Sequence, residues 1–293
     1  MDHMTAKVSC FARAYHYKNN DTHIFTDNIA EKLLGDDYEQ IAKSMTDGLD
    51  FFFPEYKGAK EEGLRFIVNK QLSPSVLARS AFCEEKLKDE IVNEWKQYII
   101  FAAGYDTFSL RNCDSSLKIF ELDQPQLLED KKERIRQAKV RSSAINVPCN
   151  LAETAWKDQL LDAGYVKNQK AFGSLLGISY YLKKADFEQL ILNIRDIMTE
   201  GSAICFDYPS TDESMETRKN KMLAAGAKEQ MKASYSYEEI KELLWKCGFD
   251  LREHLDSKEM TDRYFKEYNQ VNLEDQMQAP VGVGYVYAER KHF

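Results

Sequence analysis

The chain has 293 residues and a formal net charge of −8, because 48 aspartates and glutamates outnumber 40 lysines and arginines. Its hydrophobic fraction of 43% is too high for a disordered chain, and its length suits one large domain or two small ones. The acidic balance gives no global basic field, so we expect neither nucleic acid nor a membrane surface as a partner.

The remaining composition excludes several further classes. The longest apolar run, residues 98–103, is far shorter than the roughly 20 residues of a membrane helix, and the N-terminus shows no apolar signal segment. Six cysteines lie far apart without a Cys-x-x-Cys pair, and five histidines are dispersed. We therefore expect reduced thiols, no metal site and a cytoplasmic location.

Residues 1–95 are predicted to form an N-terminal helical cap. Thr26 is a capping residue for a helix that Gly35 ends, and residues 64–69 and 76–95 have amphipathic patterns. Ser73 and Pro74, which lie between these two segments, predict a break between the helices.

From residue 97 the pattern changes to short apolar segments that alternate with helical ones. The predicted strands are residues 97–102, 116–122, 143–147, 170–176, 201–207, 249–255 and 282–289. The predicted helices are residues 125–140, 153–163, 185–199 and 236–247. This alternation indicates an α/β fold with a doubly wound, mostly parallel, seven-stranded sheet. No regular helix is predicted between the last two strands, which favours an antiparallel late pair.

Ligands of doubly wound sheets bind outside the carboxyl ends of the strands, so the residues directly after each strand are the candidates. Gly104 follows the first strand, where a missing Cβ lets a ligand approach the backbone. Asp123 lies 19 positions further and Glu121 lies 17 further, and an acid at this spacing can accept both ribose hydroxyls.

The residues around Gly104 also limit the kind of cofactor. A single glycine, with Asp106 at the incoming helix, disfavours a pyrophosphate. A nucleoside without phosphate, such as S-adenosylmethionine, fits better. Spacing alone leaves open the alternative that Gly104 only makes a turn and the acid only caps a helix.

Several motifs in combination resemble the leucine carboxyl methyltransferase family, which includes bacterial polyketide O-methyltransferases. The matching segments are Ala78-Arg-Ser-Ala-Phe82, Tyr98-Ile-Ile-Phe-Ala-Ala-Gly-Tyr-Asp-Thr-Phe-Ser-Leu-Arg111, Ile119-Phe-Glu-Leu-Asp-Gln-Pro125, Asn150-Leu151 and Leu176-Gly-Ile-Ser-Tyr-Tyr-Leu182. The resemblance runs over residues 8–208. It implies a class I S-adenosylmethionine-dependent methyltransferase with a Rossmann-like domain over residues 96–293. The polar stretch 209–235 is predicted to be a lid insertion.

The resemblance also implies which residues bind the cofactor. Arg79 would hold the methionine carboxylate, and Asp123, with Gln124 beside it, would accept the ribose hydroxyls. The methionine part would be lined by Ala103, Gly104, Tyr105 and Asp106. Asn150 and Leu151 would flank the adenine, and Leu176 would lie beside the methionine amino group or the sulfonium.

Three positions depart from the family pattern. Ala102 replaces the first glycine of Gly-x-Gly, Asn150 replaces an aspartate, and Leu176 replaces a glutamate. The last change removes a carboxylate that would face a positive ligand, which predicts weaker cofactor binding by about 1 kcal/mol or more.

The resemblance implies an O-methyltransferase that acts on a small-molecule carboxylate or acidic hydroxyl by in-line transfer. A carboxylate needs no general base, whereas a hydroxyl benefits from one. His16 and His254 are candidate bases, although a lone histidine is more often a packing residue. Tyr180 and Tyr181 are candidates to orient the acceptor, with one of them in this role and the other packed in the core.

Two other functions stay open. Leu176 and Ala102 suggest a non-catalytic or divergent protein that binds S-adenosylmethionine or S-adenosylhomocysteine on the same fold. Methylation of a protein C-terminus, as in eukaryotic family members, is the third interpretation.

Overall fold

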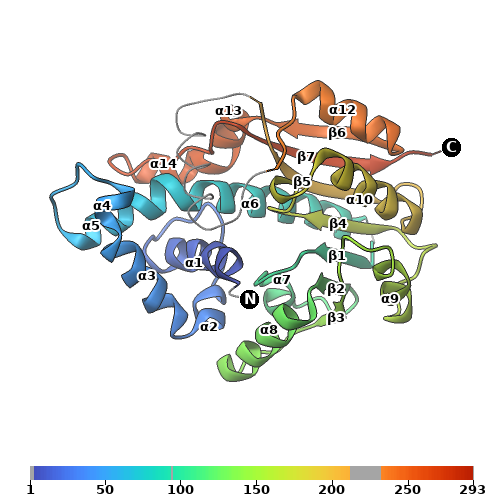
Figure 1. Ribbon diagram of the computed structural model, residues 1–293, viewed down its shortest axis with the longest axis horizontal. Helices are drawn as coiled ribbons and strands as arrows, with labels where there is room; N and C mark the ends of the chain where they lie inside the picture. The colour runs from blue at the N-terminus through green and yellow to red at the C-terminus, as the bar shows by residue number, and fades with distance from the viewer. Residues whose placement is uncertain (1–2, 94, 212–231, 293) are drawn as a thin grey trace.

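A seven-stranded sheet forms the centre of the computed structural model, which describes residues 3–93, 95–211 and 232–292. The strand order is β3-β2-β1-β4-β5-β7-β6 (Figure 1). The strands are β1 (Gln97–Phe101), β2 (Lys118–Asp123), β3 (Ala144–Pro148), β4 (Ala171–Leu175), β5 (Ala203–Pro209), β6 (Phe249–Leu255) and β7 (Val283–Arg290). β7 runs antiparallel to both β5 and β6, and the other neighbours pair in parallel. The predicted doubly wound sheet with an antiparallel late pair is confirmed.

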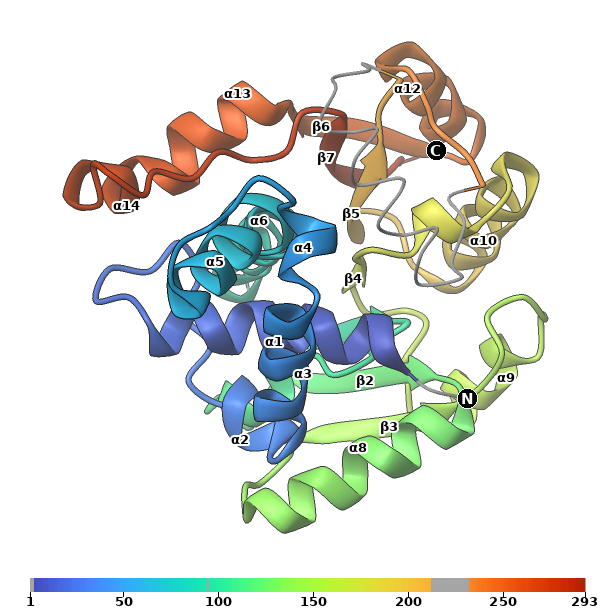
Figure 2. The same cartoon turned by 60° about the vertical axis from the view of Figure 1, so that its left-hand side comes forward.

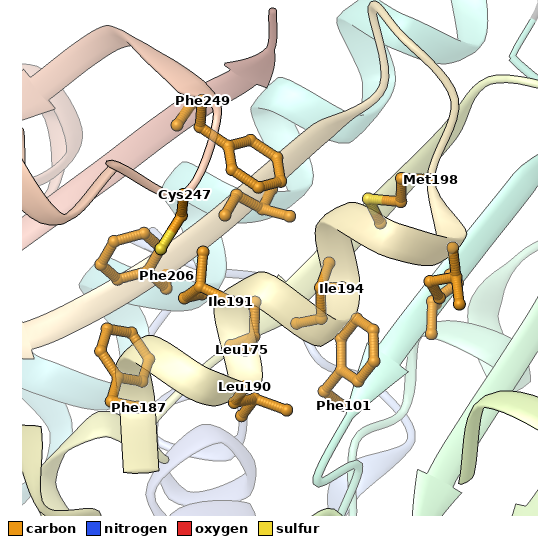
Figure 3. Close-up of a cluster of buried hydrophobic side chains, with 14 of the residues drawn as sticks. Phe101, Leu175, Phe187, Leu190, Ile191, Ile194, Met198, Phe206, Cys247 and Phe249 are labelled. Atoms are coloured by element: carbon orange, nitrogen blue, oxygen red, sulfur yellow. The ribbon is translucent and has the colours of Figure 1, made fainter. Parts of the chain in front are cut away.

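Helices that follow the strands cover one face of this sheet. They include α9 (Trp156–Asp162), α10 (Lys184–Ile197) and α12 (Tyr237–Lys246). Figure 3 shows α10 side chains such as Leu190 and Ile194 packed near Phe101 of β1 and Phe206 of β5. Alternate residues of each strand point to this face, as the period of two requires.

The opposite face of the sheet packs against α6 (Ser73–Val92). Leu77, Phe82 and Leu87 of this helix are buried with Tyr98 of β1 and Tyr285 of β7. The last helix of the predicted cap is thus also one layer of the sheet domain. A division of the chain near residue 95 stays a prediction.

The helices before α6 gather beside the carboxyl ends of the central strands (Figure 2). They are α1 (Met4–Lys18), α2 (Ala30–Leu34), α3 (Asp37–Asp47), α4 (Leu49–Phe52), α5 (Lys60–Ile67) and the π-helix η1 (Val68–Leu72). Their core contains Phe11, Leu34 and Tyr38, together with Tyr105 after β1 and Leu127 of α8 (Pro125–Ala138). The N-terminal helices are therefore packed onto the loop that follows the first strand.

Two helix boundaries predicted in this region were wrong. No break occurs at Ser73 and Pro74, because η1 leads directly into α6 and Pro74 occupies its first turn, where no amide donor is needed. The helix predicted from Thr26 begins at Ala30 instead. The carboxylate of Asp27, not Thr26, accepts the backbone N–H of Ala30 at 3.1 Å.

The segment between β6 and β7 also differs from the prediction. It is helical as α13 (Ser257–Met260), the π-helix η3 (Thr261–Phe265) and α14 (Lys266–Val271). Met260, Phe265 and Tyr268 are its buried residues. Their spacing of five and then three positions follows the wider π-turn, so a search for the α-helical period does not find it.

Candidate functional site

The loop after β1 and the end of β2 meet through the carboxylate of Asp123. The backbone N–H of Gly104 donates to Asp123 Oδ2 at 2.8 Å, and the N–H of Gln124 donates to Oδ1 at 2.7 Å. Gly104 has φ +51°, which a glycine adopts without strain. A carboxylate offers about four acceptor positions, so each oxygen of Asp123 retains one for a diol.

Glu121, the other acid at suitable spacing, is buried, and both of its carboxylate oxygens bond to side chains of the protein. Its Oε2 lies 2.6 Å from Lys131 Nζ and its Oε1 accepts the hydroxyl of Ser109 at 2.7 Å. Glu121 and Lys131 are both buried. Of the two acids that the spacing left open, only Asp123 lies beside Gly104.

The pKa of Asp123 reflects its position at the rim of the site. Burial raises it above its ordinary value, and the hydrogen bonds from the N–H groups of Gly104 and Gln124 oppose this without cancelling it. His3 and Lys131 are close enough to lower the pKa slightly.

Helix α1 crosses the loop after β1 with three side chains at helical spacing. Ala6 lies 3.4 Å from the place of a Cβ at Gly104, Ser9 Oγ lies 3.4 Å from Arg79 Nη2, and Arg13 donates to the carbonyl of Tyr105 at 2.7 Å. Positions 6, 9 and 13 share one face of a helix. This face covers the predicted cofactor loop.

Tyr105 and Asp106 take different roles within that loop. The Tyr105 phenol donates to Asp130, and its ring is buried in the core of the N-terminal helices. Because its side chain points into that core, Tyr105 contributes only its backbone to the surface of the loop. Asp106 accepts the N–H of Phe108 at 2.8 Å and thereby supports the start of α7 (Phe108–Arg111). Ala103 is buried beside them.

Arg79 reaches the carboxyl end of β4 from α6. Its Nη1 lies 3.6 Å from Asp207 Oδ2, and a Cβ at Gly177 would stand only 2.7 Å from the same nitrogen. Gly177 has φ +69° and directly follows Leu176. The guanidinium therefore lies against the turn after β4, and its role at the methionine carboxylate stays a prediction.

Leu176 and the two tyrosines follow the same strand. Leu176 is half-buried and packs against the α6 side of the core. The Tyr180 hydroxyl donates to Asp207 Oδ2 at 2.9 Å, so this buried tyrosine is already engaged within the chain. The Tyr181 ring lies 6.3 Å from that of Tyr180. Acceptor orientation by either tyrosine stays a prediction.

Asn150 and Leu151 lie after β3, on the other side of Asp123. Asn150 is exposed, its Oδ1 accepts the N–H of Ala152 at 3.1 Å, and its Nδ2 donates to Glu153 at 2.9 Å. Leu151 is half-buried against the core. Both follow β3, which pairs with β2, and their role at the adenine stays a prediction.

The described ends of the predicted lid pair with each other and with the segment that follows β4. Residues 212–231 are outside the described part of the chain. The N–H of Lys232 donates to the Tyr180 carbonyl at 2.8 Å, and Ser210 forms a bridge with Tyr235.

The two candidate bases are both engaged. His254 Nε2 lies 2.9 Å from the Tyr208 hydroxyl. His16 is fully buried, and its Nε2 accepts the N–H of Ile24 at 2.9 Å, which fixes a neutral ring. Burial, together with the charges of His23 and Arg65, lowers the pKa of His16 to about 3.

The low pKa of His16 predicts that the protein loses stability in mild acid. The unfolded chain takes up this proton below about pH 6.5, whereas the folded chain does not, so the free energy of unfolding should fall by about 2 kcal/mol between pH 6.5 and 5. Urea titrations at several pH values measure this slope. His16→Gln should reduce it. Equal slopes in the two proteins would contradict the prediction.

Ala102 carries a strain that glycine would remove. Its φ is +52°, in the left-handed region that costs an L-residue about 1 kcal/mol. Ala102→Gly should therefore raise the free energy of unfolding by about 0.5–1 kcal/mol, even though glycine makes the unfolded chain more flexible. Ala103→Gly is the matched control and should lower it, because Ala103 does not have a positive φ. Changes of the same sign in both variants would contradict the strain.

Two sets of important residues escaped assignment at the sequence level. Asp207 lies near the carboxyl end of β5 and partners Arg79, and the rule that ligands bind at the carboxyl ends of strands would have pointed to it. Asp27 and Arg13 form a buried ion pair at 2.8 Å, and the Thr107 hydroxyl donates to the same carboxylate at 2.6 Å. Asp27 lies within residues 8–208, over which the resemblance runs, but no role was assigned to it.

Comparison with known proteins identifies similar sequences. A profile of the family described as leucine carboxyl methyltransferase matches residues 6–195. YktD of Bacillus subtilis (strain 168) is named as a candidate S-adenosyl-L-methionine-dependent methyltransferase. It is 35% identical to this chain over an alignment 305 residues long, which covers 98% of each chain.

Two solved structures share the fold. A candidate methyltransferase from Thermobifida fusca YX has a TM-score of 0.59 at 13% identity, over 89% of this chain and 93% of that chain. The magnesium protoporphyrin IX methyltransferase ChlM of Synechocystis PCC 6803, solved with bound S-adenosylhomocysteine, has a TM-score of 0.50 at 6% identity, over 86% and 97%. Among the described residues, no helix has the length and apolar character needed to cross a membrane.

Proposed function

Because the chain belongs to the leucine carboxyl methyltransferase family and is an S-adenosylmethionine-dependent methyltransferase, we propose that it methylates an oxygen of a small-molecule carboxylate or acidic hydroxyl. The cofactor, when bound, supplies a methyl group already activated by its sulfonium. The chain's own residues then have to bind the cofactor, align the acceptor and exclude water.

One observation carries the choice of acceptor. Three side chains among the described residues that could act as a base are engaged: His16 with a backbone N–H, His254 with Tyr208, and Tyr180 with Asp207. An acceptor that is already anionic, or that ionises easily, needs no such base. This supports a carboxylate or an acidic hydroxyl over an alcohol.

In this proposal each binding residue at the strand ends contacts a different part of the cofactor. Asp123 would accept the ribose hydroxyls while Gly104 and Gln124 hold its carboxylate in place. Arg79 would receive the methionine carboxylate. Helix α1 covers the loop through Ala6 and Arg13, which would keep water from the reacting atoms.

Methyl transfer to defined acceptor classes tests the proposal. Purified protein with methyl-labelled S-adenosylmethionine is offered aliphatic acids, phenols, amines, thiols and a peptide with a free C-terminal carboxylate. We expect label in the acids, released by mild alkali as from an ester, or in acidic phenols as an alkali-stable ether. Transfer confined to amines or thiols would overturn the proposal, and transfer to the peptide alone would favour a protein substrate.

A non-catalytic binding role is the second candidate, and Leu176 is the observation that favours it. A half-buried leucine stands where the family pattern has a carboxylate. This role predicts that S-adenosylhomocysteine binds while every acceptor class stays unlabelled.

A further inference from the structure

Asp207 is a fully buried carboxylate in β5, two residues before the strand ends, and its side chain bonds to the turn after β4 and lies beside Arg79. Its Oδ1 accepts the N–H of Gly177 at 2.7 Å, and its Oδ2 accepts the Tyr180 hydroxyl at 2.9 Å. The Ser179 hydroxyl donates to its carbonyl at 2.7 Å. These bonds come from the turn after β4, so they fix the carboxylate against that turn.

The charge partner of this carboxylate is Arg79. The distance of 3.6 Å from Nη1 to Asp207 Oδ2 exceeds that of a good N–H···O bond, as does the 3.4 Å from Nη2 to Ser9. The guanidinium has five donors, so most of them remain for another acceptor. Arg79 keeps 15% of its side chain exposed, whereas Asp207 keeps 1%. The pair therefore extends from the interior, at the aspartate, to the rim of the site, at the arginine.

We propose that Asp207 is a positioning residue, anchored by the Gly177 N–H and the Tyr180 hydroxyl, which holds the Arg79 guanidinium where its free donors meet the α-carboxylate of the cofactor. The proposal rests on the role given to Arg79 in the proposed function. Burial keeps Asp207 from touching the cofactor itself, so its effect passes through Arg79. In this proposal the Tyr180 hydroxyl helps to hold the Asp207 carboxylate in place.

Two ligands separate this role from simple support of the fold. S-adenosylhomocysteine carries the amino-acid end that Arg79 would bind, and 5′-methylthioadenosine lacks it. Calorimetric titration of the wild-type protein should detect both ligands. Asp207→Asn should weaken S-adenosylhomocysteine by about tenfold or more, as expected for a lost charge-assisted contact, and change 5′-methylthioadenosine less than about twofold.

A double-mutant cycle makes the test specific. Arg79→Ala should show the same selective loss, and combining it with Asp207→Asn should add little, because both act on one contact. Equal weakening of both ligands by Asp207→Asn, or additive losses in the double variant, would overturn the proposal. If Asp207→Asn does not fold, Tyr180→Phe takes its place, with a selective loss of a few-fold expected and no loss refuting it.

Tyr285 supplies a local control. It pairs with Asp207 in the β5–β7 register, and its buried hydroxyl has no hydrogen-bond partner in the described structure. Tyr285→Phe should leave both affinities unchanged, and a selective loss there would contradict the assignment to Asp207. Failure of the methyl-transfer assay with intact selective binding would refute the proposed function and leave this inference standing.

Discussion

Asp27→Asn is expected to lower the free energy of unfolding by about 3–5 kcal/mol, a large share of the 5–15 kcal/mol typical of a folded protein. Asp27 is fully buried, and its carboxylate joins the N-terminal helices to the cofactor loop. Arg13 lies at 2.8 Å and the Thr107 hydroxyl donates at 2.6 Å, while Arg111 lies at 3.6 Å. An amide of the same shape would leave the buried Arg13 guanidinium without its counter-charge, whereas Arg111 would keep its second partner, Glu84.

The pKa of Asp27 supports this expectation. Burial alone would raise it, but the charges of Arg13 and Arg111 and the hydrogen bonds from Thr107 and Arg13 outweigh burial, so the pKa is lowered. The folded state thus favours the ionised form. A group of this kind stabilises the protein above its unfolded pKa, near 3.9, and loses that contribution as the pH falls further.

Urea denaturation followed by circular dichroism measures the effect of Asp27→Asn at pH 7. Asp262→Asn is the matched control, because Asp262 pairs with Lys258 at 2.8 Å on an exposed helix turn. That pair should contribute less than about 1 kcal/mol. A change below 1 kcal/mol for Asp27→Asn would show that the buried network does not hold the N-terminal helices in place.

The sheet was predictable because its signals are local. β6 occupies residues 249–255 as predicted, and the other strands agree within a few residues, since short buried strands bounded by polar turns mark themselves in the sequence. The nearness of Asp123 to Gly104 was predictable for a similar reason. The 19 positions between them span one short helix and the next strand, so both residues lie at the carboxyl ends of neighbouring strands.

The partners of buried charges were not predictable in this way. Arg79 and Asp207 come from α6 and β5, and only the packing of that helix on the sheet brings them together. Asp27 and Thr107 likewise meet because α1 and α2 dock on the loop after β1. Contacts between distant segments leave no periodic trace. Two further features were missed: the chain is helical without a break from η1 into α6, and the segment between β6 and β7 is helical. Both contain a π-helical turn, η1 or η3, which the α-helical period does not describe.

Asp123→Ala should weaken S-adenosylhomocysteine and 5′-methylthioadenosine alike, each by about 100-fold. Two hydroxyls bonded to one carboxylate are charge-assisted contacts, and their joint loss of about 2–3 kcal/mol corresponds to that factor. Both ligands contain the ribose, so the loss should not depend on the amino-acid end. This pattern differs from the one expected at Arg79 and Asp207, where only S-adenosylhomocysteine is affected.

Asp114→Ala is the control for that measurement. Asp114 also accepts a backbone N–H, from Ser116 at 2.8 Å, but it precedes β2 and therefore lies at the amino ends of the strands. Its removal should leave both affinities unchanged in a calorimetric titration. If Asp123→Ala binds 5′-methylthioadenosine as tightly as the wild type, Asp123 does not hold the ribose, and the free acceptor positions on its two oxygens serve another purpose. If both ligands weaken together, the ribose and methionine parts of the site are assigned by two independent patterns of loss.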